Sequence, residues 1–192
     1  MKHLSITARR VAAVAAAVVA GLAISTAAYA ATSSGTVRTT TAAIPRCTAF
    51  DIGAWVAAEQ GNGALGTIYY PLEFTNLSHH TCSLFGYPGV SALDRNGHQL
   101  GSPARWGSRA GAHTVYLAPG ATAHTILAYH DAVVYTEPGC DPVNSAAFLR
   151  IFPPDQYNAT YTFFSLEVCS HAGPIYMDLT EPIIPGVGTI NG

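Results

Sequence analysis

The stretch FTNLSHHTCSLFGYPGVSALDRNG, residues 74–97, decides the fold of this chain. It contains the end of one β-strand, a short polar link with Cys82, and a second strand with an apolar run at 90–93. Asn96-Gly97 is the dipeptide that most readily adopts the left-handed backbone of a type I′ turn. The stretch therefore predicts two strands, a cysteine at the start of the second, and a hairpin turn.

Residues 1–30 predict a signal peptide. A basic start precedes an apolar segment at 11–24, and a small-x-small motif at 28–30 predicts cleavage near Ala30. The apolar segment is shorter than the roughly 20 residues of a membrane helix, so no membrane span is expected in the mature chain. The protein is expected to be secreted or extracellular, with cell-wall association open. The twin arginine at 9–10 leaves both the general and the twin-arginine export routes open.

Charge excludes one class of partner. The 192-residue chain has nine basic and 11 acidic residues, and three of the basic ones lie in the signal peptide, so the mature chain has six arginines, no lysine and a formal charge of −5. A protein that neutralises phosphates needs basic clusters, so nucleic-acid binding is disfavoured. The low charge and the high content of Gly, Pro, Thr and Tyr favour a globular all-β domain.

The rest of the chain divides into a flexible linker at 31–45, a β-sandwich domain at 46–182 and a flexible, fraying tail at 183–192. About seven to nine short strands with turn signals between them are typical of a β-sandwich. The clearest strand covers 66–75. Alternation predicts one inward face for it, made of Ile68, Tyr70, Leu72 and Phe74. Pro71 has no N–H, which predicts a sheet edge or a bulge there.

Four cysteines follow the signal peptide: Cys47, Cys82, Cys140 and Cys169. An even number in an exported chain predicts disulfides, and four cysteines allow three connectivities. The pairs Cys47–Cys82 and Cys140–Cys169 are favoured, because each pair brackets one half of the domain. Zinc is the weaker interpretation, since no two cysteines have C-x-x-C spacing.

Several short motifs together resemble one family, the domain of unknown function 4232 family of exported actinobacterial proteins. They are, in order, Cys47, FTN (74–76), TCSLFGYPGV (81–90), D-x-x-G (94–97), LAPGATA (117–123), Cys140, LRIFPP (149–154) and VC (168–169). The resemblance covers roughly residues 47–180. It implies an immunoglobulin-like sandwich with paired cysteines, and it implies no catalytic residue and no ligand. Many members are lipoproteins, but no cysteine follows the predicted cleavage site here, so membrane attachment is not carried over.

One loop is the strongest candidate for recognition. Residues 102–111 hold Arg105, Trp106 and Arg109. Trp and Arg are enriched at binding hot spots, and Trp rings stack on sugars. The alternative is a tryptophan that folds back onto the end of the core, with solvated arginines around it.

Histidines give a second hypothesis. His79 and His80 lie in the turn before Cys82, and His124 and His130 share one face of a strand by their even spacing. Neutral imidazoles bind zinc or copper, so an extracytoplasmic metal-binding protein is the alternative function. Scattered surface histidines are the simpler explanation, because no metal-ligand spacing motif is present.

Catalysis has little support in the sequence. There is no G-x-S-x-G elbow, the acids are dispersed, and oxidised cysteines supply no thiolate. We expect no enzyme activity and no cofactor. The chain is predicted to be a non-catalytic binding module at or outside the cell envelope, whose partner is a cell-envelope component or another exported protein.

Overall fold

The computed structural model describes residues 42–132, 143–170 and 176–190. Nearly all regular structure in these ranges is β, with one short 3-10 helix, η1 (Ala58–Gln60). The strands are β1 (Ile52–Val56), β2 (Asn62–Ala64), β3 (Thr67–Asn76), β4 (Cys82–Phe85), β5 (Gly89–Leu93), β6 (Gln99–Leu100), β7 (Arg105–Trp106), β8 (Thr114–Leu117), β9 (Thr122–His130), β10 (Val143–Phe152), β11 (Thr160–Cys169), β12 (Met177–Leu179) and β13 (Ile184–Pro185).

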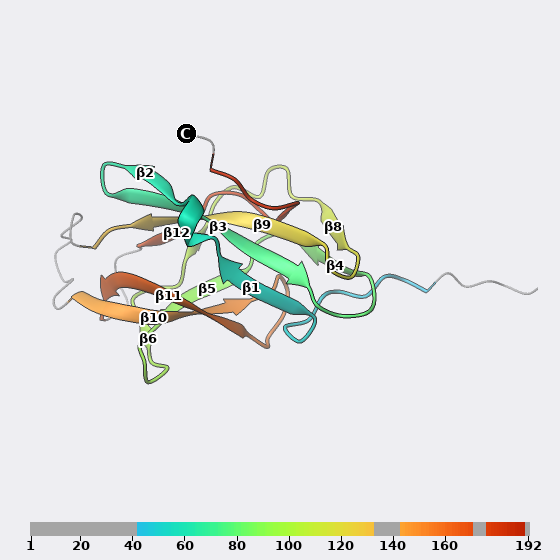
Figure 1. The fold of residues 1–192 in the computed structure, drawn as a ribbon, viewed down its shortest axis with the longest axis horizontal. Helices are drawn as coiled ribbons and strands as arrows, with labels where there is room; N and C mark the ends of the chain where they lie inside the picture. The colour runs from blue at the N-terminus through green and yellow to red at the C-terminus, as the bar shows by residue number, and fades with distance from the viewer. Residues whose placement is uncertain (1–41, 133–142, 171–175, 191–192) are drawn as a thin grey trace, which may run out of the picture. The chain divides into compact units, whose positions relative to one another are not determined.

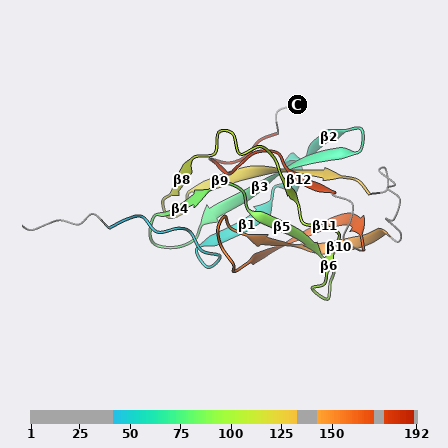
Figure 2. The same cartoon turned by 180° about the vertical axis from the view of Figure 1, so that it is seen from behind.

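Two sheets face each other in this domain (Figures 1 and 2). The 7-stranded sheet has the order β1-β3-β9-β12-β7, with β2 paired to β3 and β13 paired to β9. The 4-stranded sheet has the order β11-β10-β5-β6, and β4 and β8 form a separate pair. The predicted all-β fold is therefore confirmed. Its immunoglobulin-like variety stays a prediction.

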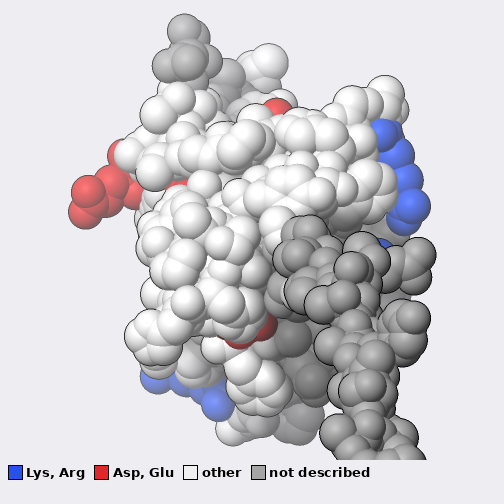
Figure 3. All heavy atoms as spheres, turned by 90° about the vertical axis from the view of Figure 1, so that its right-hand side faces the viewer, with Lys and Arg blue, Asp and Glu red and all other residues white. Residues whose placement is uncertain are grey.

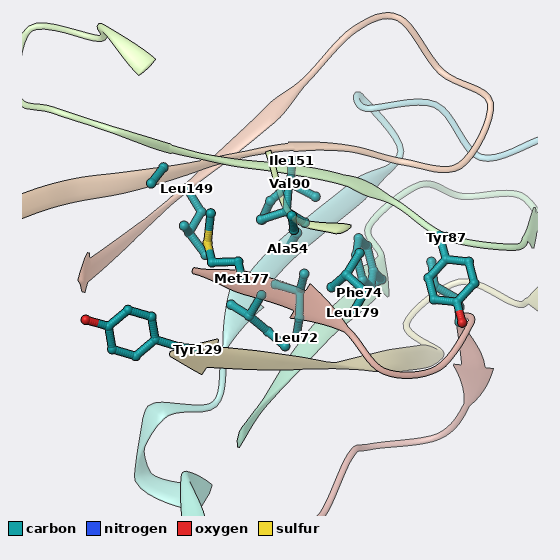
Figure 4. Close-up of a cluster of buried hydrophobic side chains, with 14 of the residues drawn as sticks. Ala54, Leu72, Phe74, Tyr87, Val90, Tyr129, Leu149, Ile151, Met177 and Leu179 are labelled. Carbon is teal, nitrogen blue, oxygen red and sulfur yellow. The ribbon is translucent and has the colours of Figure 1, made fainter. Parts of the chain in front are cut away.

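The core lies between the two sheets (Figure 4). Val90, Leu149 and Ile151 come from the 4-stranded sheet, and side chains of the other sheet point toward them, among them Leu72, Phe74, Met177 and Leu179. All seven are at most 1% exposed. Burial of such aliphatic and aromatic side chains supplies most of the driving force for folding.

β3 is an interior strand, so the prediction from Pro71 is wrong. β3 pairs with β1 on one side and with β9 on the other, where Pro71 lies opposite Ile126. The Pro71 carbonyl accepts the N–H of Ala57 at 2.9 Å, one residue after β1 ends. In an antiparallel ladder N and O of one residue face the same neighbour. The side of Pro71 that lacks an N–H therefore faces Ala57, which lies just after the end of β1.

The hairpin between β5 and β6 is confirmed, but its turn is not of type I′. Only Gly97 has a positive φ, of 85°, whereas type I′ also requires one at Asn96. The Gly97 N–H donates to the Asp94 carbonyl at 3.2 Å, and the Asp94 N–H donates to the His98 carbonyl at 2.9 Å. The Asp94 carboxylate also accepts the N–H groups of Asn96 and His98. These bonds favour a three-residue loop with Gly97 as its left-handed residue.

One predicted disulfide is confirmed. Cys47 and Cys82 are joined, and both are fully buried. The bond attaches the start of the domain to β4, next to a parallel bridge between Arg46 and Ser83. Cys140 lies outside the described residues, so the pair Cys140–Cys169 stays a prediction.

Asn76, the last residue of β3, is 1% exposed and fully hydrogen-bonded through its side chain. Its amide nitrogen donates to the carbonyls of His80 and Leu117, both at 2.8 Å. Its amide oxygen accepts the N–H and the hydroxyl of Ser78. One side chain thus joins β3, the 77–81 turn and the end of β8.

The C-terminal residues differ from the predicted fraying tail. β13 pairs with β9, and Ile183 is fully buried. The segment continues over Glu73, a carboxylate only 1% exposed, which accepts the Gly188 N–H at 2.8 Å. His124, opposite Glu73 on β9, lies 2.8 Å from the Gly186 carbonyl through Nδ1. Burial raises the pKa of Glu73, and the hydrogen bond from the Gly188 N–H and the nearby His124 act in the opposite direction without cancelling the increase.

We expect Asn76→Asp to destabilise the fold by about 3 kcal/mol, because two buried carbonyls lose their donor and a carboxylate faces them instead. Chemical denaturation at neutral pH measures the free energy of unfolding. The matched control is Asn158→Asp, since Asn158 is exposed. Equal stability of the two variants would contradict the role given to Asn76.

Glu73 should make stability pH-dependent. Because its pKa is raised in the folded state, its protonated form stabilises the fold below its ordinary pKa of 4.5, and this contribution is lost as the pH rises through the folded-state value. The free energy of unfolding of Glu73→Gln should therefore increase relative to wild type between about pH 4 and pH 7. Glu59→Gln, at an exposed position, is the control. A free energy of unfolding of Glu73→Gln that stays constant or falls relative to wild type as the pH rises would refute the assignment.

Candidate functional site

The predicted recognition loop is anchored by a short strand that sequence patterns did not reveal. β7 pairs in parallel with β12, with Arg105 opposite Asp178 and Trp106 opposite Leu179. The Gly107 N–H then donates to the Leu179 carbonyl at 2.8 Å. A Cβ at Gly107 would lie 2.9 Å from this same oxygen, so only glycine lets the loop approach so closely. The loop is therefore fixed at its base.

β7 directs two of the three predicted binding residues, Arg105 and Trp106, to opposite sides of the strand. Successive side chains of a strand point to opposite sides, and Arg105 turns to Asp178, with its Nε 2.7 Å and its Nη2 3.1 Å from the two carboxylate oxygens. The same carboxylate lies 2.9 Å from His130 Nε2, and His130 Nδ1 lies 2.9 Å from the Thr67 hydroxyl. Arg105 thus belongs to a polar network that joins β7, β12, β9 and β3. Sequence reasoning missed this network, because its members are far apart in the chain.

Trp106 is held from several directions and remains 46% exposed. Its ring is nearly parallel to that of Tyr87, at 13° and 6.1 Å between centroids, and its indole N–H donates to the Pro88 carbonyl at 2.8 Å. The Tyr87 hydroxyl donates to the Ser108 carbonyl at 2.6 Å, which fixes the loop against the turn that precedes β5. The guanidinium carbon of Arg109 lies 5.3 Å from the Trp106 ring centroid. Trp106 and Arg109 therefore lie next to each other, and the tryptophan does not fold into the core.

These two residues line a groove of about 630 Å³. Its walls come from the end of β4, the 86–89 turn, the 105–112 segment, the end of β10 and the turn that follows it, and they include five aromatic side chains: Phe85, Tyr87, Trp106, Phe152 and Tyr157. Phe85 is 45% and Tyr157 97% exposed. The volume lies within the range of small-ligand sites, about 300–1,000 Å³. Sequence analysis did not select Phe85 or Tyr157. Tyr157 carried a signal, because it is a large aromatic residue in a polar turn.

Charge within the groove is uneven. Asp155 lines it and forms an ion pair with Arg46, whereas Arg109 has no ion pair with a carboxylate among the described residues. Burial raises the pKa of Tyr87, and Glu181 adds to this while Arg109 opposes it. On the end of the domain seen in Figure 3 most of the described surface is uncharged, with basic side chains toward the edges and a few acidic side chains at the left edge, at the top and low in the middle. The groove can stack flat groups and bind an anion at Arg109.

The candidate metal-binding histidines lie in separate environments. His79 and His80 are exposed in the 77–81 turn, and His80 Nε2 lies 3.8 Å from Asp51. His124 and His130 share a face of β9 as predicted, but His124 contacts the Gly186 carbonyl and His130 contacts Thr67 and Asp178. In the ranges that the structure describes, no three His, Cys, Asp or Glu side chains are grouped as metal ligands.

No helix of the described residues is long and apolar enough to cross a membrane.

The comparisons with known proteins identify a family and nothing closer. No curated protein and no solved structure gives a significant match. Residues 47–173, from the first cysteine of the domain to just beyond β11, match one family profile. The chain belongs to the family described as domain of unknown function DUF4232.

Proposed function

We propose that this protein is an exported, non-catalytic binding module that holds a ligand outside the cell in the aromatic groove around Trp106. The observation that carries the proposal is the indole of Trp106, half exposed although Tyr87, Pro88 and Arg109 fix its position. A large ring that is rigid before binding loses little conformational entropy when a ligand covers it. Such rings are the usual centres of binding energy.

Export is the second part of the proposal. It is supported by the basic start, apolar segment and small-x-small motif of residues 1–30. The disulfide between Cys47 and Cys82 agrees with an oxidising compartment. A cell-envelope component or another exported protein is the corresponding partner class.

The groove is tested by three variants in co-sedimentation with envelope preparations of the source organism. Trp106→Ala and Arg109→Ala should each weaken the apparent affinity by about tenfold or more, since both line the groove. Arg105→Ala is the matched control, because it removes the same charge from the same loop but its partner is Asp178. The proposal fails if the Trp106 and Arg109 variants sediment like wild type.

Export is tested by intact-mass spectrometry of the protein recovered from the culture medium of the source organism. We expect the mass of residues 31–192, less two hydrogens for each of two disulfides. Reduction under denaturing conditions followed by alkylation should then label four cysteines. Recovery only from the cytoplasm, with residues 1–30 retained, would refute export.

A further inference from the structure

Within the groove, Arg109 is the residue that indicates a particular kind of ligand. The chain pairs Arg46 with Asp155 and Arg105 with Asp178, but it gives Arg109 no carboxylate partner among the described residues. A guanidinium offers a planar set of donors that fits a carboxylate or a phosphate. In a mature chain with a formal charge of −5, such a group adds a local site for an anion.

The guanidinium is also held in place before any ligand arrives. It lies 5.3 Å from the centroid of the Trp106 ring, and that ring is fixed by Tyr87 and by its hydrogen bond to the Pro88 carbonyl. The negative face of an indole ring attracts a guanidinium placed over it. The donors of Arg109 are therefore oriented by contacts within the protein.

The other groups of the groove suit a saccharide. Phe85 and Tyr157 present exposed rings, and aromatic rings pack against the C–H faces of sugar rings. Gln156 and Asp155, also in the lining, offer the donor and acceptor groups that sugar hydroxyls bind. A volume of about 630 Å³ admits a few sugar units.

We infer that the groove binds a saccharide that carries a negatively charged group, and that Arg109 binds this group while the aromatic side chains contact the sugar rings. This inference rests on the proposed function and specifies its ligand. The negative group is a carboxylate or a phosphate, because the guanidinium fits both.

The test is calorimetric titration of the disulfide-bonded mature chain with matched pairs of saccharides. One pair is trigalacturonic acid and its methyl ester, and the other is a hexose phosphate and the free hexose. The charged member of at least one pair should bind at least about tenfold more tightly than its neutral partner, and added salt should reduce the difference. The pair that shows the effect identifies carboxylate or phosphate as the negative group.

Two variants test whether Arg109 is responsible for the preference for the charged saccharide. Arg109→Ala should bind the charged and neutral members equally, whereas Arg105→Ala should discriminate between them as wild type does, because Asp178 already holds Arg105. Equal binding of charged and neutral saccharides by wild type would overturn the role of the anion. So would unchanged discrimination in Arg109→Ala.

The two sets of experiments test the identity of the ligand separately from the proposed binding function. If no saccharide of the panel binds, the inference is wrong. The binding function then still stands as long as Trp106→Ala loses envelope binding. If wild type and Trp106→Ala bind envelopes equally, the proposed function itself is wrong.

Discussion

The buried amide of Asn76 is the interaction on which the arrangement of this domain depends. Asn76 ends the interior strand β3, and its side chain bonds to two carbonyls from two other segments, at His80 and Leu117. A buried amide with all its partners satisfied fixes a unique geometry, because any displacement leaves a desolvated polar group unpaired. The β4–β8 pair is positioned in this way at the end of the core, and the disulfide between Cys47 and Cys82 attaches it a second time.

The groove follows from that position. Phe85 ends β4, and Tyr87 comes two residues later, so the placement of β4 brings both aromatic rings to the loop that carries Trp106. The short strand β7 supplies the other constraint, since alternation along a strand directs Arg105 and Trp106 to opposite sides. One residue thereby strengthens the framework, and its neighbour remains available to a ligand.

Part of this could be predicted from residue patterns. Strand β3 and its core-facing side follow from the alternation of Ile68, Tyr70, Leu72 and Phe74. The expected edge at Pro71 was wrong because a missing N–H is harmless wherever the neighbouring strand has ended. The expected type I′ turn was wrong because Asp94 accepts local N–H groups and stabilises a longer loop around the same Gly97.

The sequence by itself determined the all-β class and the core-facing side of β3, it favoured the pairing of Cys47 with Cys82, and it selected Trp106 and Arg109 as candidate binding residues. These depend on local periodicity and on residue chemistry, which the order of residues contains directly. Only the tertiary structure decided that Arg105 pairs with Asp178, that Phe85 and Tyr157 line the groove, and that Glu73 is buried beneath the C-terminal segment. Each of these depends on contacts between residues far apart in the chain, such as Arg105 and Asp178, and no local pattern records which distant segments will meet.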